Sequence, residues 1–361
     1  MRRIVPRAPH PLELDARNGH APDLAHLDSL CHHLGVVQFA RGETRDIGSG
    51  FCVDDNARAL IVAVDVLALD PRNAAAHRIG EAALRLLERT QLGDDGFHNL
   101  LDERGEFVRE NGRSEDATGR AFWALGVAAA RALDATWRAR AEALLMKTWS
   151  AAGRLEHVRP RAYAVLGAAA IAHRSAQAKD VLARLGAALL QSYTASATPS
   201  WPWWEPELTW ANARLPEAML RAAAVPGAPS AFGECGLRAL EFLGTVTHER
   251  GIFVPIGNDG WYKRDGPRAR HDQQPIEAAA MVDAWLAAFD LTGAQEHRAR
   301  ALEAFAWFFG ANTERLLVAD PQTGGCHDGL LRGGRNRNMG AESTLSYLQA
   351  HAAIARLAAA H

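Results

Sequence analysis

The sequence predicts an all-α fold in which twelve helices form a closed double ring of six helical hairpins. Three observations lead to this prediction. Alanine and leucine dominate the chain, while runs of β-branched residues are scarce. Helices with one polar face alternate with helices that are apolar on nearly all sides. A short polar cluster stands where each of the apolar helices is expected to begin.

The helices with one polar face are expected to form the outer ring. In residues 76–90, Ile79, Ala82 and Leu86 recur at helical spacing, and Glu81 and Arg85 take the opposite face. Helices of this kind are predicted over roughly 23–37, 75–91, 135–150, 176–194, 229–247 and 296–311.

The apolar helices are expected to form the inner ring, because a helix without a polar face must be covered on every side. They are predicted over roughly 54–69, 115–133, 160–173, 212–224, 273–291 and 340–357. Pro160 and Pro275 suit a first helical turn, where the missing N–H costs nothing. Long loops over 92–114, 195–211, 248–272 and 313–339 precede inner helices, and loops of this length are usually functional.

Bulk composition limits the possible partners and compartments. A chain of 361 residues, 48% hydrophobic and 23% charged, suits one large domain over 1–361 with an irregular segment over about 1–22. A net charge of −2 without a Lys/Arg block argues against nucleic acid and anionic membranes as partners. No apolar run could span a membrane, and the basic N-terminus lacks the apolar stretch of a secretory signal. Four scattered cysteines suggest free thiols, so we expect a cytoplasmic protein.

The six polar clusters are expected to meet at one end of the ring, since each opens an inner helix. They cover residues 53–58, 114–120, 159–163, 209–214, 271–275 and 339–344. Together they supply carboxylates, amides and guanidinium groups around one mouth, which favours an enzyme or a sugar-binding protein over a scaffold.

Six hairpins with acidic and aromatic motifs at the inner-helix starts resemble the (α/α)6 toroids of the six-hairpin glycosidase superfamily. Glycoside hydrolases, glycoside phosphorylases and the N-acylglucosamine 2-epimerase group share that architecture. The Val-Asp-Asp-Asn-Ala-Arg segment at 53–58 is also similar to one in bacterial proteins labelled glycosyltransferase or glycosidase. The resemblance implies a carbohydrate-active toroid.

Acidic side chains at the mouth indicate glycoside cleavage, which needs one carboxyl group as acid and a second as base or nucleophile. The leading candidates are Asp55, Glu115 and Asp272, followed by Glu205 and Glu342. An inverting outcome is expected, as is usual on this architecture. The alternative is that these acids only cap their helices, where the helix dipole favours them.

Tryptophans and polar side chains at the mouth are candidates for holding the sugar. Tryptophan rings pack on sugar C–H surfaces, and amides offer both donors and acceptors. The alternatives are that the 201–206 loop hides its own tryptophans and that Arg58, Arg120 and Arg214 pair with buried acids. The predicted substrate-binding residues are Asp54, Asn56, Asp116, Arg161, Trp201, Trp203, Trp204, Asn212, Arg214, Trp261, His271, Gln273, Gln274 and Asn338.

Other functions stay open from the sequence. His157 and His271 precede inner helices and would serve a sugar epimerase or isomerase as acid and base. A non-catalytic or glycosyltransferase-associated sugar-binding protein would use the same tryptophans, and a prenyl-processing toroid would need a more apolar pocket. Neither a cofactor nor a metal is expected, because nucleotide-binding glycine motifs are absent and Cys31-His32-His33 and Cys326-His327-Asp328 hold only adjacent ligands.

Overall fold

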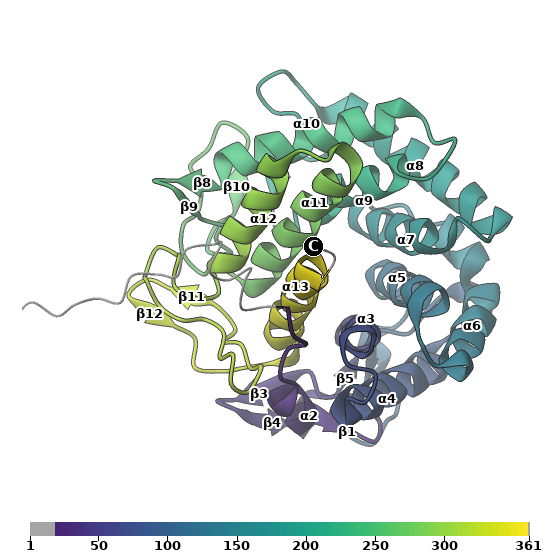
Figure 1. The fold of residues 1–361 in the computed structure, drawn as a ribbon. Coiled ribbons are helices and arrows are strands. Elements are labelled where there is room, and N and C mark those ends of the chain that lie inside the picture. The colour runs from purple at the N-terminus through teal and green to yellow at the C-terminus, as the bar shows by residue number, and fades with distance from the viewer. Residues whose placement is uncertain (1–18, 360–361) are drawn as a thin grey trace, which may run out of the picture.

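The chain forms two concentric rings of helices (Figure 1). The computed structural model describes residues 19–359, apart from the side chain of Asn111, so most of the segment expected to be irregular lies outside it. The inner helices are α3 (Val53–Leu69), α5 (Glu115–Arg131), α7 (Val158–Ile171), α9 (Arg214–Ala223), α11 (Pro275–Thr292) and α13 (Ala341–Ala359). The outer helices are α2 (Ala25–Leu30), α4 (Ala74–Thr90), α6 (Ala135–Gly153), α8 (Ala176–Ser196), α10 (Ser230–Val246) and α12 (Gln295–Ala306). Helix α13 packs on both α11 and α3, which closes the inner ring and confirms the predicted double ring.

The first outer helix is the one clear error in the predicted elements. A helix was expected over 23–37, but α2 ends at Leu30 and the chain turns into the hairpin of β1 (Cys31–His32) and β2 (Gly35–Val36). Gly35 has a φ of 143°, and the Asn56 side chain bonds both the N–H and the carbonyl of Val36. These contacts stabilise an extended backbone that helical spacing does not reveal.

Side chains at the helix starts explain why several of the helices begin where they do. Ser114 caps α5 by accepting from the N–H of Ala117 at 3.2 Å, and Asp134 caps α6 in the same way. Cys52 takes this place at α3, where its sulfur accepts from the N–H of Asp55 at 3.4 Å. Pro275 is the first residue of α11, as its fixed φ favours.

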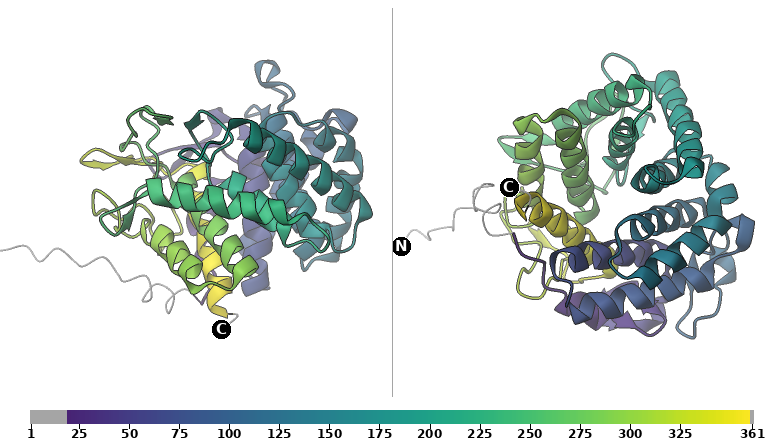
Figure 2. Two further views of the ribbon diagram at one scale, coloured as in Figure 1. Left: turned by 90° about the horizontal axis from the view of Figure 1, so that it is seen from above. Right: turned by 45° about the vertical axis from the view of Figure 1, so that its right-hand side comes forward.

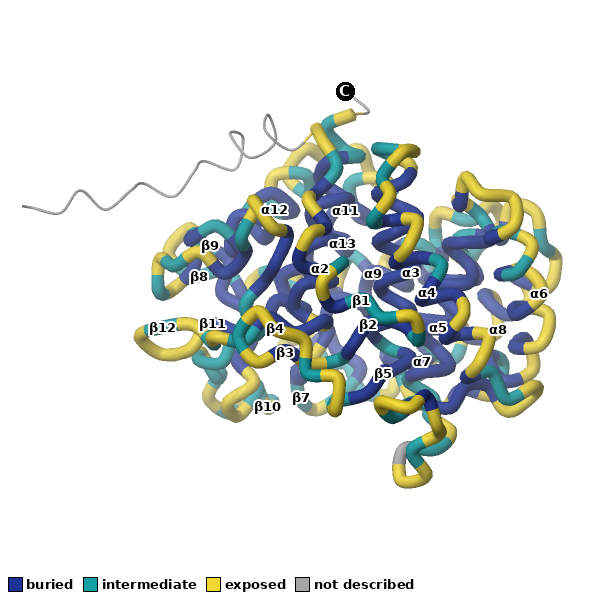
Figure 3. The backbone as a smooth tube through the Cα atoms, turned by 90° about the horizontal axis from the view of Figure 1, so that it is seen from below, coloured by how far each residue is buried: buried dark blue, intermediate teal, exposed yellow. Residues whose placement is uncertain are grey.

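Burial separates the two rings as the hydrophobic pattern predicts. In Figure 3 the inner helices are dark blue over most of their length, whereas α6 and α8 show exposed segments at the edge. Glycines allow the closest approach: a Cβ added at Gly126 of α5 would strike the backbone of Gly167 in α7. The inner helices therefore form a densely packed wall.

The loops at the mouth end of the ring are not purely irregular, because they contain short antiparallel strand pairs. Within residues 19–359 they are β1–β2, β3–β4 (Phe39–Arg41, Thr44–Asp46), β5–β6 (Phe51–Cys52, Leu100–Leu101), β7–β10 (Glu207–Leu208, Tyr262–Lys263), β8–β9 (His248–Glu249, Ile252–Phe253) and β11–β12 (Leu330–Leu331, Gly334–Arg335). Turns of 3-10 helix lie at Ile47–Ser49, Gly93–Asp95 and Arg109–Asn111. Pairs β5–β6 and β7–β10 each join segments that precede different inner helices, so they tie neighbouring loops together. Among the described helices, none has the length and apolar character needed to cross a bilayer.

Candidate active site

The six polar clusters lie at or just before the first turns of the inner helices. In the left panel of Figure 2, α13 runs to the C-terminus at the lower edge, and extended loops gather at the opposite end of the ring. Because consecutive inner helices are neighbours around the ring, their starts bring residues far apart in sequence to one mouth. The first and last inner helices meet there as well.

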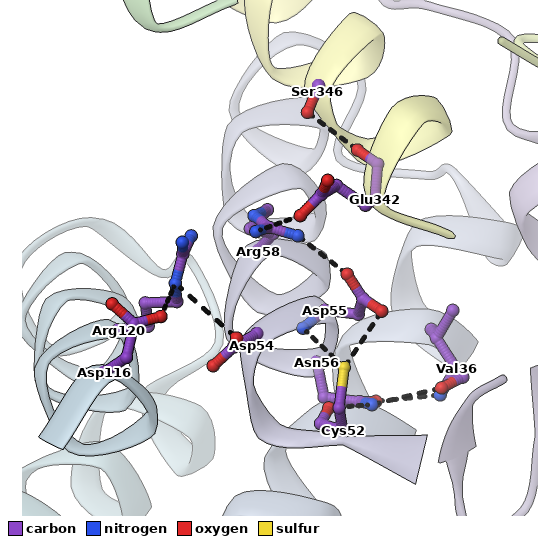
Figure 4. A network of polar contacts seen from close by, with 10 residues as sticks. All are labelled: Val36, Cys52, Asp54, Asp55, Asn56, Arg58, Asp116, Arg120, Glu342 and Ser346. Carbon is purple, nitrogen blue, oxygen red and sulfur yellow. Dashed lines mark hydrogen bonds and ion pairs between the residues drawn. The ribbon is translucent and has the colours of Figure 1, made fainter. Parts of the chain in front are cut away.

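Arg58 joins these two helices through two carboxylates (Figure 4). Its guanidinium bonds Asp55 at 2.7 Å and Glu342 at 2.9 Å, and the Arg58 side chain is only 4% exposed. The second oxygen of Asp55 accepts from the Cys52 thiol at 2.9 Å. Asp55 is therefore buried with both oxygens bonded, whereas 48% of the Glu342 side chain stays open to solvent.

Asp54 differs from its neighbour in having an oxygen without a partner. Its Oδ1 accepts no hydrogen bond from any described residue, and its Oδ2 lies 3.8 Å from Arg120 Nε. Burial raises the pKa of Asp54 to about 7; the charge of Asp116 adds to the rise, and Arg120 opposes it. The Asp54 side chain is 27% exposed overall, but its partnerless Oδ1 is itself buried.

Arg120 binds a second carboxylate in this region, that of Asp116. It bonds Asp116 at 2.7 Å, one turn earlier in α5, and its guanidinium lies 4.3 Å from the centre of the Tyr163 ring. Asp116 is about one third exposed. Oxygens of Asp54 and Asp116 thus approach the same Arg120 nitrogen, which places the two carboxyl groups close together.

Glu115, a leading catalytic candidate, connects two loops of the mouth. It accepts from the backbone N–H groups of Glu156 and His157, both at 3.0 Å, and lies 2.8 Å from His157 Nδ1. Burial acts to raise the pKa of Glu115, but the bonds from the His157 ring and from both N–H groups lower it overall. A carboxylate held ionised in this way is poorly suited to donate a proton.

Glu205, another catalytic candidate, is paired with an arginine that sequence reasoning left out of the site. Arg159 bonds both Glu205 oxygens, at 2.7 and 2.9 Å, and also donates to Thr209 and to the carbonyl of Trp210. Arg159 is 4% exposed. This cluster fixes the loop between α8 and α9 against the start of α7.

Glu277 is a buried carboxyl group that the sequence analysis missed. It accepts from the backbone N–H of Ala211 and from Asn212 Nδ2, and burial raises its pKa to about 7. A signal was present in the sequence, since a carboxylate in the first turn of an otherwise apolar helix requires a partner. Both Glu277 oxygens are bonded to the chain, so it orders the mouth rather than offering a free acid.

The tryptophans of the 201–206 loop do not form the predicted sugar-stacking surface. Trp201, Trp203 and Trp204 are 3%, 0% and 4% exposed, respectively. Trp201 and Trp204 donate their indole N–H groups to carbonyls at 2.8 and 2.9 Å, and the three rings pack among themselves and on Phe242 and Tyr193. These three rings are therefore part of the packed outer wall, and the prediction that they stack on a sugar is corrected.

Four amide residues predicted to bind substrate instead bond the chain itself. Asn56, Asn212 and Gln273 are at most 1% exposed. Asn56 fixes Val36, and Asn212 bonds both backbone groups of Thr209. Gln273 bonds Arg270, Thr313 and Trp307, and Asn338 accepts from the N–H of Gly42. Their polar atoms satisfy backbone and side-chain groups that loops at the mouth would otherwise leave without partners.

The two predicted arginines also bond within the fold. Arg214 is 4% exposed and binds Glu217 and Asp283 at 2.6 and 2.7 Å, as the buried-pair alternative proposed. Arg161 donates to the carbonyl of Leu155 at 2.8 Å and is partly exposed. Arg214 therefore belongs to the centre of the ring and not to a binding surface.

The 257–274 loop places its candidates at the rim. His271 lies 3.3 Å from Arg332 Nε, and Asp272 accepts from Asn258 Nδ2 at the same distance. Trp261 donates its indole N–H to Asn258 Oδ1 at 2.8 Å. These residues are partly exposed, as is Gln274 at the start of α11, so all remain accessible.

Comparison with known proteins identifies the fold. No family model matches the chain, and no curated protein matches it in sequence. A cellobiose 2-epimerase from Bacillus thermoamylovorans matches with a TM-score of 0.71 at 12% identity, over 96% of this chain and 98% of that one. A D-mannose isomerase matches with a TM-score of 0.66 at 13% identity, over 92% and 94%.

An α-1,6-mannanase from a Salegentibacter species matches with a TM-score of 0.62 at 11% identity, over 96% of this chain and 98% of that one. That structure is an inactive variant with two consecutive aspartates replaced by alanine, in complex with α-1,6-mannotetrose. At these identities the likeness is one of fold. The chain has the (α/α)6 six-hairpin fold, which confirms the architecture implied by the sequence resemblance.

Proposed function

We propose that this protein cleaves a glycosidic bond, with Asp54 as the general acid. One observation carries the proposal: the Asp54 side chain is 27% exposed at the mouth, its buried Oδ1 has no partner among the described residues, and its pKa is raised to about 7. A carboxyl group that holds its proton near neutral pH can protonate a leaving oxygen. The other candidate carboxylates at the mouth are bonded to arginine, histidine, amide or backbone groups.

Glu342 is proposed as the base that activates water. One of its oxygens bonds Arg58 at 2.9 Å, and nearly half of the side chain is exposed. In the reaction, Asp54 gives its proton to the glycosidic oxygen as the bond to the anomeric carbon breaks. Glu342 takes a proton from the water whose oxygen bonds that carbon, so the products are a free sugar and an alcohol, with inversion.

Similarity to known proteins supports a sugar substrate. The solved structures that share the fold include proteins named for action on cellobiose, mannose and α-1,6-mannan. The mannanase variant made inactive lost two consecutive aspartates, and Asp54 and Asp55 are consecutive here. In this chain Asp55 would then position Arg58, and through it Glu342, while Asp54 transfers the proton.

The proposal is tested with Asp54→Asn and Glu342→Gln on a panel of glucosides, mannosides and galactosides. Each variant should lower kcat/KM by about 100- to 10,000-fold, as expected for loss of a general acid or base. Asp94→Asn, an exposed carboxylate in the loop before α5, is the matched control and should retain full turnover. Sugar binding by the wild type without turnover on any glycoside would refute the proposal in favour of a binding protein. Activity that survives Asp54→Asn would exclude this acid, and loss with Asp116→Asn rather than Glu342→Gln would move the second role to Asp116.

A sugar epimerase is the second candidate, and one observation favours it. The epimerase and isomerase structures match with TM-scores of 0.71 and 0.66, against 0.62 for the mannanase. His157 with Glu115, 2.8 Å apart, is the acid–base pair that such a reaction would use. Deuterium incorporation at sugar C2 in D2O, abolished by His157→Ala and kept by Asp54→Asn, would establish epimerisation and overturn glycoside cleavage.

A further inference from the structure

Two of the ten tryptophans in this chain are not buried, and they are neighbours. Eight are buried in the helical wall or the 201–206 loop, whereas Trp210 is 42% exposed and Trp261 is partly exposed. Their ring centres are 6.2 Å apart, with the planes inclined at 43°. The pairing of Leu208 with Tyr262 in β7–β10 brings their loops together. Neighbouring exposed indoles on a protein surface indicate a binding surface.

Arg159 fixes the position of Trp210. The Arg159 guanidinium lies 4.5 Å from the centre of its ring, and Arg159 Nε donates to the Trp210 carbonyl at 2.7 Å. Arg159 is itself bonded to Glu205, which neutralises its charge. Arg159 therefore holds Trp210 in place while 42% of the residue stays exposed.

The position of Trp261 is fixed by strained backbone. Trp261 has a φ of 55°, and its ring is oriented by Asn258, which also bonds Asp272 through backbone and side chain. Ala211 and Asp272, with φ of 48° and 56°, also adopt the left-handed region. Such strain in non-glycine residues collects at ligand sites, where the surrounding contacts maintain it. Both loops at this rim are thus pre-organised.

We infer that Trp210 and Trp261 form a subsite that stacks a neutral sugar ring beside the cleaved bond, so the substrate is a disaccharide or longer. This inference rests on the proposed function. The indole faces would cover the C–H surface of the ring, and Glu205, Asn258 and Asp272 offer hydrogen-bonding groups to its hydroxyls. A neutral sugar fits because Arg159, the cation beside the Trp210 ring, is already paired with Glu205.

The inference is tested by calorimetric binding in an Asp54→Asn background, so that no cleavage disturbs the measurement. The probes are cellobiose, α-1,6-mannobiose, lactose and α-1,6-mannotetraose, with glucose, mannose and galactose as single-ring counterparts. Trp210→Ala and Trp261→Ala should each weaken the best-bound oligosaccharide by roughly 10-fold. Its single-ring counterpart should change by less than about 2-fold. Trp210→Phe should recover part of the loss.

Leu133→Ala is the control, since Leu133 is a 55% exposed apolar residue in the turn between α5 and α6 at the other end of the ring. Equal loss for one ring and for several, no loss in either tryptophan variant, or no binding of any probe would overturn the subsite. Its failure is distinguishable from failure of the proposed function. A subsite without catalysis appears as oligosaccharide binding by a wild type that turns nothing over, and catalysis without the subsite appears as turnover that Trp210→Ala leaves unchanged.

Discussion

Carboxylates inside the inner ring and one carboxylate at its mouth, Asp54, differ in how they are paired. Inside the ring, a cavity of about 430 Å³ is lined by Asp65, Glu217 and Asp283. Asp65 binds Arg131 at 3.1 Å and Arg356 at 2.6 Å, while Glu217 and Asp283 share Arg214. At the mouth, by contrast, Asp54 has only a distant guanidinium and one oxygen without a partner among the described residues.

The difference shows that pairing, more than burial, separates a structural carboxylate from a chemical one. Asp65 and Asp283 are 3% and 8% exposed and hold helices together because arginines satisfy them. Burial raises the pKa of Asp54 to about 7, because Arg120, 3.8 Å away, offsets it only in part. Three substitutions test this contrast.

The largest effect is expected from Arg214→Met at the centre of the ring. This change leaves Glu217 and Asp283 buried without their cation, so the free energy of unfolding should fall by about 3–5 kcal/mol. Arg221→Met on the same helix removes the exposed pair with Asp290 and should cost under about 1 kcal/mol. Urea denaturation measures both, and similar losses would show that pairing inside the ring has no special weight.

A smaller effect is expected from Asp54→Asn at the mouth, and it should depend on pH. Because the pKa of Asp54 is raised to about 7, the native state keeps a proton that the unfolded chain releases above about pH 4. The wild type should therefore lose stability as pH rises from about 4 to 7.

The Asn variant lacks this loss and should be about 1–3 kcal/mol more stable than the wild type at pH 8, with little difference at pH 4. Turnover by the wild type should decline above about pH 7, since the acid is then deprotonated. Parallel stability curves for the two proteins from pH 4 to 8 would show that Asp54 titrates normally.

The smallest change in stability is expected from Glu342→Gln. Glu342 is 48% exposed and Arg58 keeps its bond to Asp55, so unfolding should change by less than about 1 kcal/mol. Glu142→Gln, which removes the exposed pair with Arg174, is the matched control for stability. Loss of turnover in Glu342→Gln without loss of stability would place this residue with Asp54, and a loss of several kcal/mol would place it with Asp65.

Most of the fold was predictable, but the mouth was predictable only in part. Helical spacing located eleven of the twelve described helices closely, because amphipathic and apolar faces are local properties. The remaining helix, predicted over 23–37, ends earlier than expected, because Asn56, distant in sequence, stabilises a hairpin there. At the mouth, the predicted Asp54 and Asp116 both approach Arg120, and the predicted Glu342 bonds Arg58, while their roles stay predictions.

The remaining errors concern residues whose hydrogen-bond partners the sequence does not reveal. Asn212 and Gln273 were predicted to bind substrate, but buried neighbours take up their polar atoms. Glu277 was missed because its partners, Ala211 and Asn212, come from another loop. The tryptophans of the 201–206 loop were predicted to stack on the sugar but are buried, whereas Trp210, which was not predicted, is exposed.

The sequence by itself determined the double ring and the polar composition of its mouth, because periodicity and helix-start residues act within one turn of the chain. Only the tertiary structure decided which polar cluster holds chemistry and which holds the fold. That decision depends on which arginine reaches which carboxylate, and on which ring stays uncovered. Those contacts form between helices and loops separated by tens to hundreds of residues, where no local pattern can specify them.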